Sequence, residues 1–119
     1  MKKKRWLSIF GVLVLIICGV AAYIYLNSDM YTVNQVNSKM NSMIRGKNYK
    51  QMKAVANNQD TYIFLRSLSS KDRVNDTSDF QGGSDENAYY VTVVKNQDLN
   101  VYMRKTGIAS WEIRRVEKQ

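Results

Sequence analysis

The longest run of apolar residues extends from Trp6 to Leu26 and contains no charged side chain. As an α-helix, these 21 residues extend about 31 Å, which matches the hydrocarbon thickness of a lipid bilayer. A helix also gives its backbone amides internal partners, as the apolar interior of a membrane requires. The pattern therefore predicts a transmembrane anchor over residues 6–26.

The residues that flank this segment predict its orientation. Aromatic residues suited to the two membrane interfaces lie near its ends: Trp6, Tyr23 and Tyr25. Four basic residues precede it: Lys2, Lys3, Lys4 and Arg5. Because the cytoplasmic flanks of membrane helices are enriched in Lys and Arg, we expect residues 1–5 in the cytoplasm and residues 27–119 on the outer side of the cell membrane.

Two other interpretations of the N-terminal segment stay open. A basic start followed by an apolar run also describes a secretory signal peptide, although such apolar runs usually have only about 7–15 residues. A bacterial lipoprotein signal makes Cys18 the acylated first residue of the mature protein, although Ile17 stands where such signals usually carry a small residue. All three interpretations place the C-terminal part outside the cytoplasm.

Two amphipathic helices are expected after the anchor. The first has apolar residues at spacings of three and four: Met30, Val33, Val36, Met40, Met43 and Ile44. Gly46 interrupts this pattern. A second run begins at Asn48 and has one apolar face: Tyr49, Met52, Val55 and Ala56.

The next two segments give weaker signals. Residues 61–68 contain β-branched and aromatic residues that favour a strand, but their apolar positions also fit a helix. Residues 69–87 are polar, include Gly82-Gly83 and show no apolar periodicity, so we expect a mobile loop.

Three strands close the chain. Residues 89–94 are dense in β-formers, residues 99–104 alternate apolar and polar positions, and Trp111 and Ile113 alternate with charged residues. Short turns between them predict an antiparallel meander, whose apolar face the preceding helices can cover. The expected fold class is α+β: an N-terminal transmembrane helix, then a helical layer packed on the meander.

Composition removes several classes of site. The 93 residues after the anchor suit one small domain. The chain has no His, and its only cysteine, Cys18, lies in the anchor, which argues against ordinary zinc sites, Ser-His-carboxylate triads and disulfides in the outer domain. Of the net charge of +8, residues 2–5 carry four units, and the mildly basic remainder does not indicate nucleic-acid binding. We therefore expect no enzymatic activity, no metal and no cofactor.

Two local features resemble the cystatin-like and nuclear-transport-factor-like folds. One is the break Gly46-Lys47-Asn48-Tyr49 followed by Met52 and Val55. The other is the terminal hairpin from Val101-Tyr102-Met103 through Gly107 to Trp111-Glu112-Ile113. The resemblance implies helices lying in the concavity of a curved sheet. It also implies a small anchored protein of Gram-positive bacteria or their mobile elements, with roles in conjugation, secretion, exclusion or immunity.

The expected function is that of an anchored extracytoplasmic protein-interaction module, an accessory component of a cell-envelope process such as conjugation or secretion. Anchoring raises its effective concentration near another envelope protein, the expected partner. Two candidate contact surfaces are expected. The first is the basic pair of helices, with Lys47, Lys50 and Lys53, and the second is the exposed side of the meander, with Tyr90, Tyr102, Arg104 and Arg114. The lysines of the predicted helices are expected to form a solvated face, and the alternative is contact with anionic lipid headgroups or an acidic envelope polymer.

Two alternatives remain for the function. One is an anchored domain that binds a lipid or a small molecule. Its adaptable pocket would be lined by the methionines at positions 30, 40, 43 and 52. The other is an exclusion or immunity lipoprotein acylated at Cys18. The sequence gives no indication of the oligomeric state.

Overall fold

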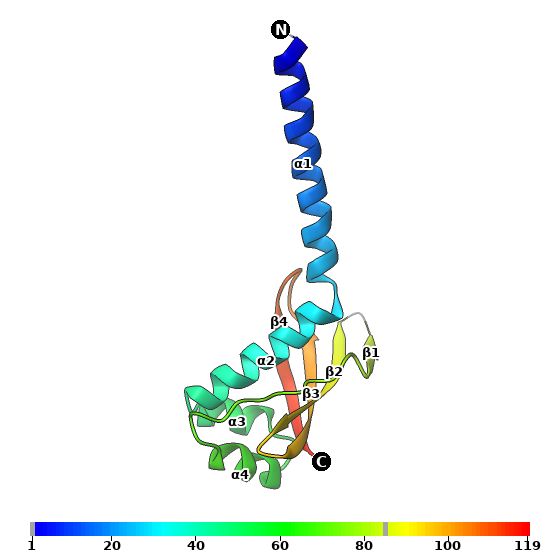
Figure 1. Ribbon diagram of the computed structural model, residues 1–119. Helices are drawn as coiled ribbons and strands as arrows, with labels where there is room; N and C mark the ends of the chain where they lie inside the picture. Colours follow the sequence, from blue (N-terminus) through cyan, green and yellow to red (C-terminus); the bar gives the residue numbers. More distant parts are fainter. Residues whose placement is uncertain (1, 85) are drawn as a thin grey trace.

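A long N-terminal helix projects from an α+β domain in the computed structural model, which describes residues 2–84 and 86–119 (Figure 1). Helix α1 spans Lys2–Leu26, contains an 18-residue stretch with a mean hydropathy of 2.7 and is not buried against the rest of the chain along that stretch. It is therefore long and apolar enough to cross a membrane. The whole molecule measures 70 × 29 × 23 Å, and α1 accounts for its elongation.

The basic residues at the N-terminus belong to α1 and extend its first turns. Lys3, Lys4 and Arg5 are exposed, whereas Met1 and the side chain of Lys2 lie outside the described part of the chain. Cys18 is also exposed, and the helix continues beyond it without a break as far as Leu26.

Helix α2 (Asp29–Arg45) follows α1 after a break of two residues. Ser28 caps it by accepting a hydrogen bond from the amide of Tyr31, with an Oγ–N distance of 3.3 Å. The predicted amphipathic pattern is confirmed for its central and last turns, where the buried side chains are Val36, Met40, Met43 and Ile44. Met30 is the exception, since it is 67% exposed and Thr32 is buried in the first turn in its place.

Two short helices come next, and asparagine caps each of them. Helix α3 (Tyr49–Val55) begins after Asn48, whose side chain accepts from Gln51 N at 3.1 Å. Helix α4 (Gln59–Ser67) begins after Asn58, whose side chain accepts from Thr61 N at 2.9 Å. Residues 61–68 are thus helical up to Ser67, which resolves the ambiguity between strand and helix.

A four-stranded antiparallel sheet, in the order β1-β2-β3-β4, forms the other layer. Its strands are β1 (Gly82–Ser84), β2 (Asn87–Val94), β3 (Gln97–Lys105) and β4 (Trp111–Lys118). The predicted meander is confirmed. Lys95 and Asn96 both have positive φ and form the tight turn between β2 and β3, where Val94 pairs with Gln97. The α+β class is likewise confirmed.

The segment expected to be a mobile loop contains no helix or strand over residues 69–81, but contacts tie it to the domain. Strand β1 lies within it, and Val74 is only 6% exposed. The amide of Val74 donates to Asn41 Oδ1 on α2 at 2.8 Å, and Asn75 forms a bridge with Val93 on β2. These contacts hold the segment along the edge of the sheet. Asp85 lies outside the described residues.

The hydrophobic core lies between the three helices α2–α4 and one face of the sheet. Its sheet side consists of Tyr90, Val94, Leu99, Val101, Met103 and Val116, all at most 1% exposed. Met40, Met43 and Met52 meet them from the helices and are equally buried. These three methionines therefore fill the core. In a ligand-binding domain, the alternative considered above, they would instead line a pocket.

Candidate interaction surface

The helices leave the second face of the sheet uncovered, and this outer face is the candidate site. Alternation along the strands places every second residue there, because successive side chains of a strand point to opposite faces. Those residues are half-buried or exposed, unlike their buried neighbours. We define the outer face by the following side chains: Asn87, Tyr89, Val91, Val93, Asn100, Tyr102, Arg104, Glu112, Arg114, Arg115 and Glu117.

An aromatic–guanidinium stack lies across the middle of the outer face. The register pairs Tyr89 on β2 with Tyr102 on β3, and Tyr102 with Arg115 on β4. The two tyrosine rings stack with their centroids 5.0 Å apart, and the Arg115 guanidinium carbon lies 4.1 Å from the Tyr102 ring centroid. The Tyr89 hydroxyl donates to Asn100 Oδ1 at 2.9 Å. The stack is therefore ordered before any partner binds.

Two arginines lie beside this stack, and a β-bulge places one of them there. Tyr102 pairs with Arg115, whereas Met103 pairs with Ile113, so Arg114 is the extra residue on β4. Arg114 Nη1 donates to Asn87 Oδ1 at 3.4 Å, and Arg104 forms an ion pair with Glu112. Tyr and Arg side chains held in this way are the types that dominate binding energy at protein interfaces.

A shallow apolar hollow of about 270 Å³ adjoins the stack. Tyr89, Tyr102 and Arg114 form part of its lining, and Gly82 and Gly83 of β1 form another part. Gly83 has a φ of +133°, and a Cβ at this position would lie 2.1 Å from the carbonyl oxygen of Asn87. Glycine thus keeps β1 close to β2 and leaves the hollow open to a side chain from outside.

Tyr90 does not belong to this surface, which corrects the sequence-based expectation. It is 1% exposed and points into the core, while its neighbour Tyr89 takes the outer position. Burial raises the pKa of the Tyr90 phenol; a hydrogen bond with Thr32 acts in the opposite direction, and the carboxylates of Asp29 and Asp79 add to the rise. Tyr102, Arg104 and Arg114 do lie together on the outer face.

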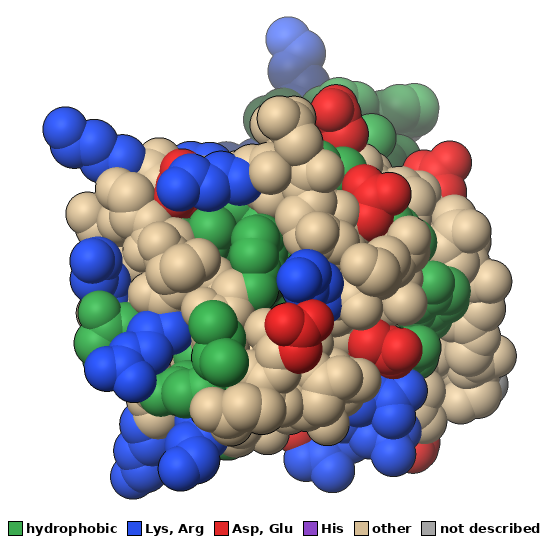
Figure 2. Space-filling view, turned by 90° about the horizontal axis from the view of Figure 1, so that it is seen from below, with side chains coloured by type: hydrophobic (Ala, Val, Ile, Leu, Met, Phe, Trp, Pro, Cys, Tyr) green, Lys and Arg blue, Asp and Glu red, His purple; other side chains and the backbone are tan. Residues whose placement is uncertain are grey.

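The predicted basic residues form a separate surface on the helical layer. Lys47, Lys50 and Lys53 are exposed, and none of them pairs with an acidic side chain among the described residues. Nearby, the Arg66 guanidinium carbon of α4 lies 5.4 Å from the ring centroid of Tyr49 on α3. Figure 2 shows basic side chains beside hydrophobic ones along its left edge, the side on which Figure 1 places α3 and α4.

The position of this basic surface argues against contact with lipid headgroups. Helices α3 and α4 lie at the end of the domain farthest from α1 (Figure 1). A membrane crossed by α1 is therefore distant from Lys47, Lys50 and Lys53, and the expected attraction to headgroups falls off within about 10 Å at moderate salt. Helix α2 follows the anchor closely in sequence, but it leads the chain to α3 and α4 at the opposite end of the domain.

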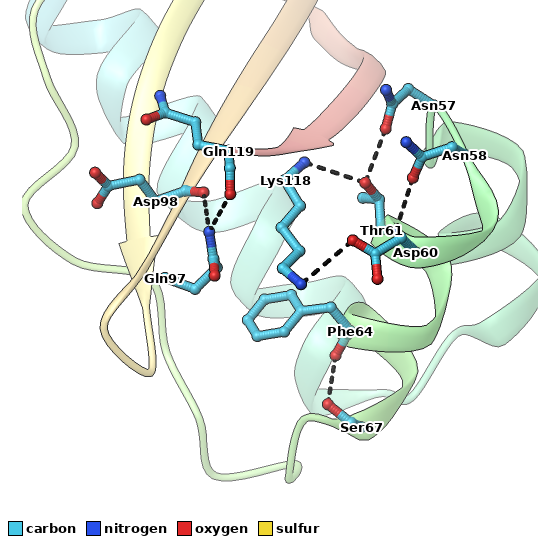
Figure 3. Close-up of polar contacts among 10 residues, drawn as sticks. All are labelled: Asn57, Asn58, Asp60, Thr61, Phe64, Ser67, Gln97, Asp98, Lys118 and Gln119. Carbon is cyan, nitrogen blue, oxygen red and sulfur yellow. Dashed lines mark hydrogen bonds and ion pairs between the residues drawn. The ribbon is translucent and has the colours of Figure 1, made fainter.

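A polar cluster fixes α4 to the C-terminal strand beside this surface (Figure 3). The backbone amide of Lys118 donates to Thr61 Oγ1 at 3.1 Å, and Lys118 Nζ lies 3.3 Å from Asp60 Oδ2. Thr61 is fully buried and its hydroxyl also donates to Asn57 Oδ1 at 2.8 Å. This cluster could not be predicted from local patterns, because Lys118 lies 57 residues from Thr61 and 58 residues from Asp60 in the sequence.

Within residues 2–84 and 86–119, no group of three or more Cys, Asp and Glu side chains is arranged to hold a metal ion. No protein-family model matches the chain, and it has no significant match among curated proteins or solved structures.

The environment of Tyr89 predicts a measurable pH dependence. Burial raises the pKa of its phenol above the ordinary value of 10.0, and the neighbouring phenol of Tyr102 and carboxylate of Glu117 add to the rise. At pH values just above about 10, the unfolded chain has released this proton while the folded protein retains it, so the free energy of unfolding falls as pH rises through this range.

Urea unfolding between pH 9 and 12 tests this expectation. The wild-type protein should lose stability more steeply with pH than a Tyr89→Phe variant, which has no phenol to titrate at this position. Equal slopes for the two proteins would show that Tyr89 has the same pKa in the folded and unfolded chain.

Proposed function

We propose that this protein is a single-pass, membrane-anchored module that binds another protein of the cell envelope through the outer face of its sheet. Helix α1 supports the anchor, because its apolar surface is not covered by the rest of the chain and exposure of such a surface to water is unfavourable. Lys3, Lys4 and Arg5 support a cytoplasmic N-terminus and an outer C-terminal domain. The cystatin-like resemblance supports an accessory role in a process such as conjugation or secretion.

Intact mass of the membrane-extracted protein separates the retained anchor from its alternatives. The full-length mass supports a transmembrane helix. A mature chain that begins with a diacylated Cys18 would identify a lipoprotein of the exclusion or immunity type instead, and a shorter unmodified chain would identify a cleaved signal peptide.

The observation that carries the interaction role is the stack of Tyr89, Tyr102 and Arg115. These side chains already lie in one row in the free protein, with 5.0 Å between the two tyrosine ring centroids and 4.1 Å between the Arg115 guanidinium carbon and the Tyr102 ring centroid. Pre-ordering these side chains lowers the entropy that a partner's binding must offset. The adjoining hollow of about 270 Å³ offers space for one apolar side chain of the partner.

Affinity purification with a C-terminal tag tests this role. A Tyr102→Ala/Arg115→Ala double variant should reduce recovery of the co-purifying envelope protein at least tenfold, because each lost hot-spot side chain costs about 2 kcal/mol or more of binding energy. The folded state of the variant is checked by circular dichroism.

A matched control removes the same two residue types elsewhere. Tyr49 and Arg66 form a second Tyr–Arg contact among the described residues, on α3 and α4. The Tyr49→Ala/Arg66→Ala variant should retain the partner. Loss of the partner in this variant, with normal recovery in the Tyr102/Arg115 variant, would assign binding to the helical surface and reject the outer face.

A further inference from the structure

The loop between β3 and β4 lies against the end of α1. Residues 106–110 connect the two strands, and Figure 1 shows this loop rising beside the last turn of the long helix. Lys105 Nζ donates to Asn27 Oδ1 at 3.2 Å, and the Tyr31 hydroxyl donates to the carbonyl oxygen of Ala109. The loop is thereby held at a defined height relative to α1.

The apolar residue of this loop lies at the height of the helix end. Ile108 is 74% exposed, whereas Trp111 and Ile113, which follow it on β4, are each 8% exposed. Tyr23 of α1 and Ile108 line the same cavity of about 420 Å³. Tyr23 lies one turn before the C-terminal end of α1, where an aromatic side chain marks the boundary between lipid and water.

We propose that the β3–β4 loop is a second membrane contact, in which Ile108 enters the interfacial region of the phospholipid bilayer that α1 crosses. This inference rests on the proposed transmembrane anchor. Tyr23 marks the position of the membrane interface along α1, and Ile108 lines the same cavity as Tyr23. The exposed isoleucine therefore lies at a depth where burial of its side chain in lipid is favourable. Lys105 at the base of the loop lies where a cationic side chain meets lipid phosphate groups.

The contact restricts the orientation of the domain relative to the membrane. A single helix followed by a short break leaves a domain free to tilt, whereas two points of contact restrict that tilt. The hydrogen bonds of Asn27 with Lys105 and of Tyr31 with Ala109 transmit the restriction to the sheet. The outer face of the sheet is then presented to a membrane partner in a restricted range of orientations.

Depth-dependent fluorescence quenching tests this contact, and the single cysteine of the chain makes the labelling specific. The full chain with Cys18→Ser and Ile108→Cys is labelled with a small environment-sensitive fluorophore and reconstituted into phosphatidylcholine–phosphatidylglycerol vesicles. Lipids with a nitroxide in the headgroup or high on the acyl chain should reduce its emission at least twofold. A Cys18→Ser/Lys50→Cys protein, labelled on α3, should lose less than a tenth of its emission.

Wild-type protein labelled at Cys18 separates failure of the loop contact from failure of the anchor. If a nitroxide deep in the acyl chains quenches Cys18 and shallow nitroxides leave position 108 unquenched, the loop contact is rejected and the anchor stands. If neither position is quenched, both proposals fail.

An unlabelled variant checks that the fluorophore does not itself draw the loop into the bilayer. In vesicles, Ile108→Asp should speed hydrogen exchange of the loop amides at least threefold relative to wild type. Equal exchange in the two proteins would overturn the proposal.

Discussion

Replacing Leu13 and Ile16 together with arginine is expected to release the protein from the membrane fraction. Both residues lie near the middle of α1 and are more than half exposed on its surface. Each arginine at the centre of a membrane helix costs about 2.5–3.5 kcal/mol, and each lost Leu or Ile removes a further contribution of about 0.3–0.6 kcal/mol. The double change therefore makes insertion less favourable by about 6–8 kcal/mol.

Alkaline extraction of isolated membranes measures this effect, because it removes peripheral proteins and leaves helices that cross the bilayer. Wild-type protein should stay in the pellet, and the double arginine variant should be absent from it. A Leu13→Val/Ile16→Val protein is the matched control and should stay with the membrane. Retention of the arginine variant would contradict an anchor formed by α1.

Truncating Leu99 to alanine is expected to cause a large loss of stability in the domain. Leu99 is fully buried on β3, the strand between β2 and β4, and it faces the helical layer. Such a change removes buried methyl groups and leaves a cavity, at a cost of about 2–5 kcal/mol. Because small domains have a total stability of about 5–15 kcal/mol, this is a substantial fraction of the free energy of unfolding.

Urea unfolding in mild detergent measures the free energy of unfolding of each variant. Two adjacent valines provide the control. Val94 is 1% exposed and faces the core, whereas Val93 lies on the outer face and is half-buried. Val94→Ala should destabilise the protein more than Val93→Ala, and Leu99→Ala more than either. An effect of Leu99→Ala no larger than that of Val93→Ala would show that the helices do not cover this face of the sheet.

Local patterns were sufficient where one face of an element is buried along its whole length. The three-and-four spacing of Val36, Met40, Met43 and Ile44 predicted α2, and the alternation in β3 predicted a half-covered strand. Met30 continued the same spacing but is exposed, because the buried side of the first turn centres on Thr32, four residues before Val36. Periodicity identifies an apolar face but not how far its cover extends.

The sequence was ambiguous where both faces of a strand carry apolar side chains. Residues 89–94 contain no clear alternation, so the choice between Tyr89 and Tyr90 as the exposed tyrosine depended on the packing of the helices. Arg115 was missed for a related reason, because the bulge at Arg114 shifts the register of β4 relative to Tyr102. The stack on the outer face thus arises from pairings between strands that no single segment encodes.

Long-range contacts also determine how the polar segment of residues 69–87 is attached to the domain. Its attachment depends on Asn37 and Asn41 of α2, which contact Thr77 and Val74 across 40 and 33 residues of sequence. Helix α4 was ambiguous by composition, and the cap at Asn58 together with the contact between Thr61 and Lys118 favours the helix. The residues involved are ordinary polar side chains, and only the fold brings them together.

Site-specific photo-crosslinking in intact membranes tests most directly whether the outer face of the sheet binds another envelope protein. A photoreactive phenylalanine analogue replaces Tyr102 in one protein and Tyr49 in a matched one. We expect a light-dependent adduct with a second protein from position 102 and none from position 49. An adduct from position 49 alone, with both proteins present at equal levels in the membrane, would contradict the proposed interaction surface.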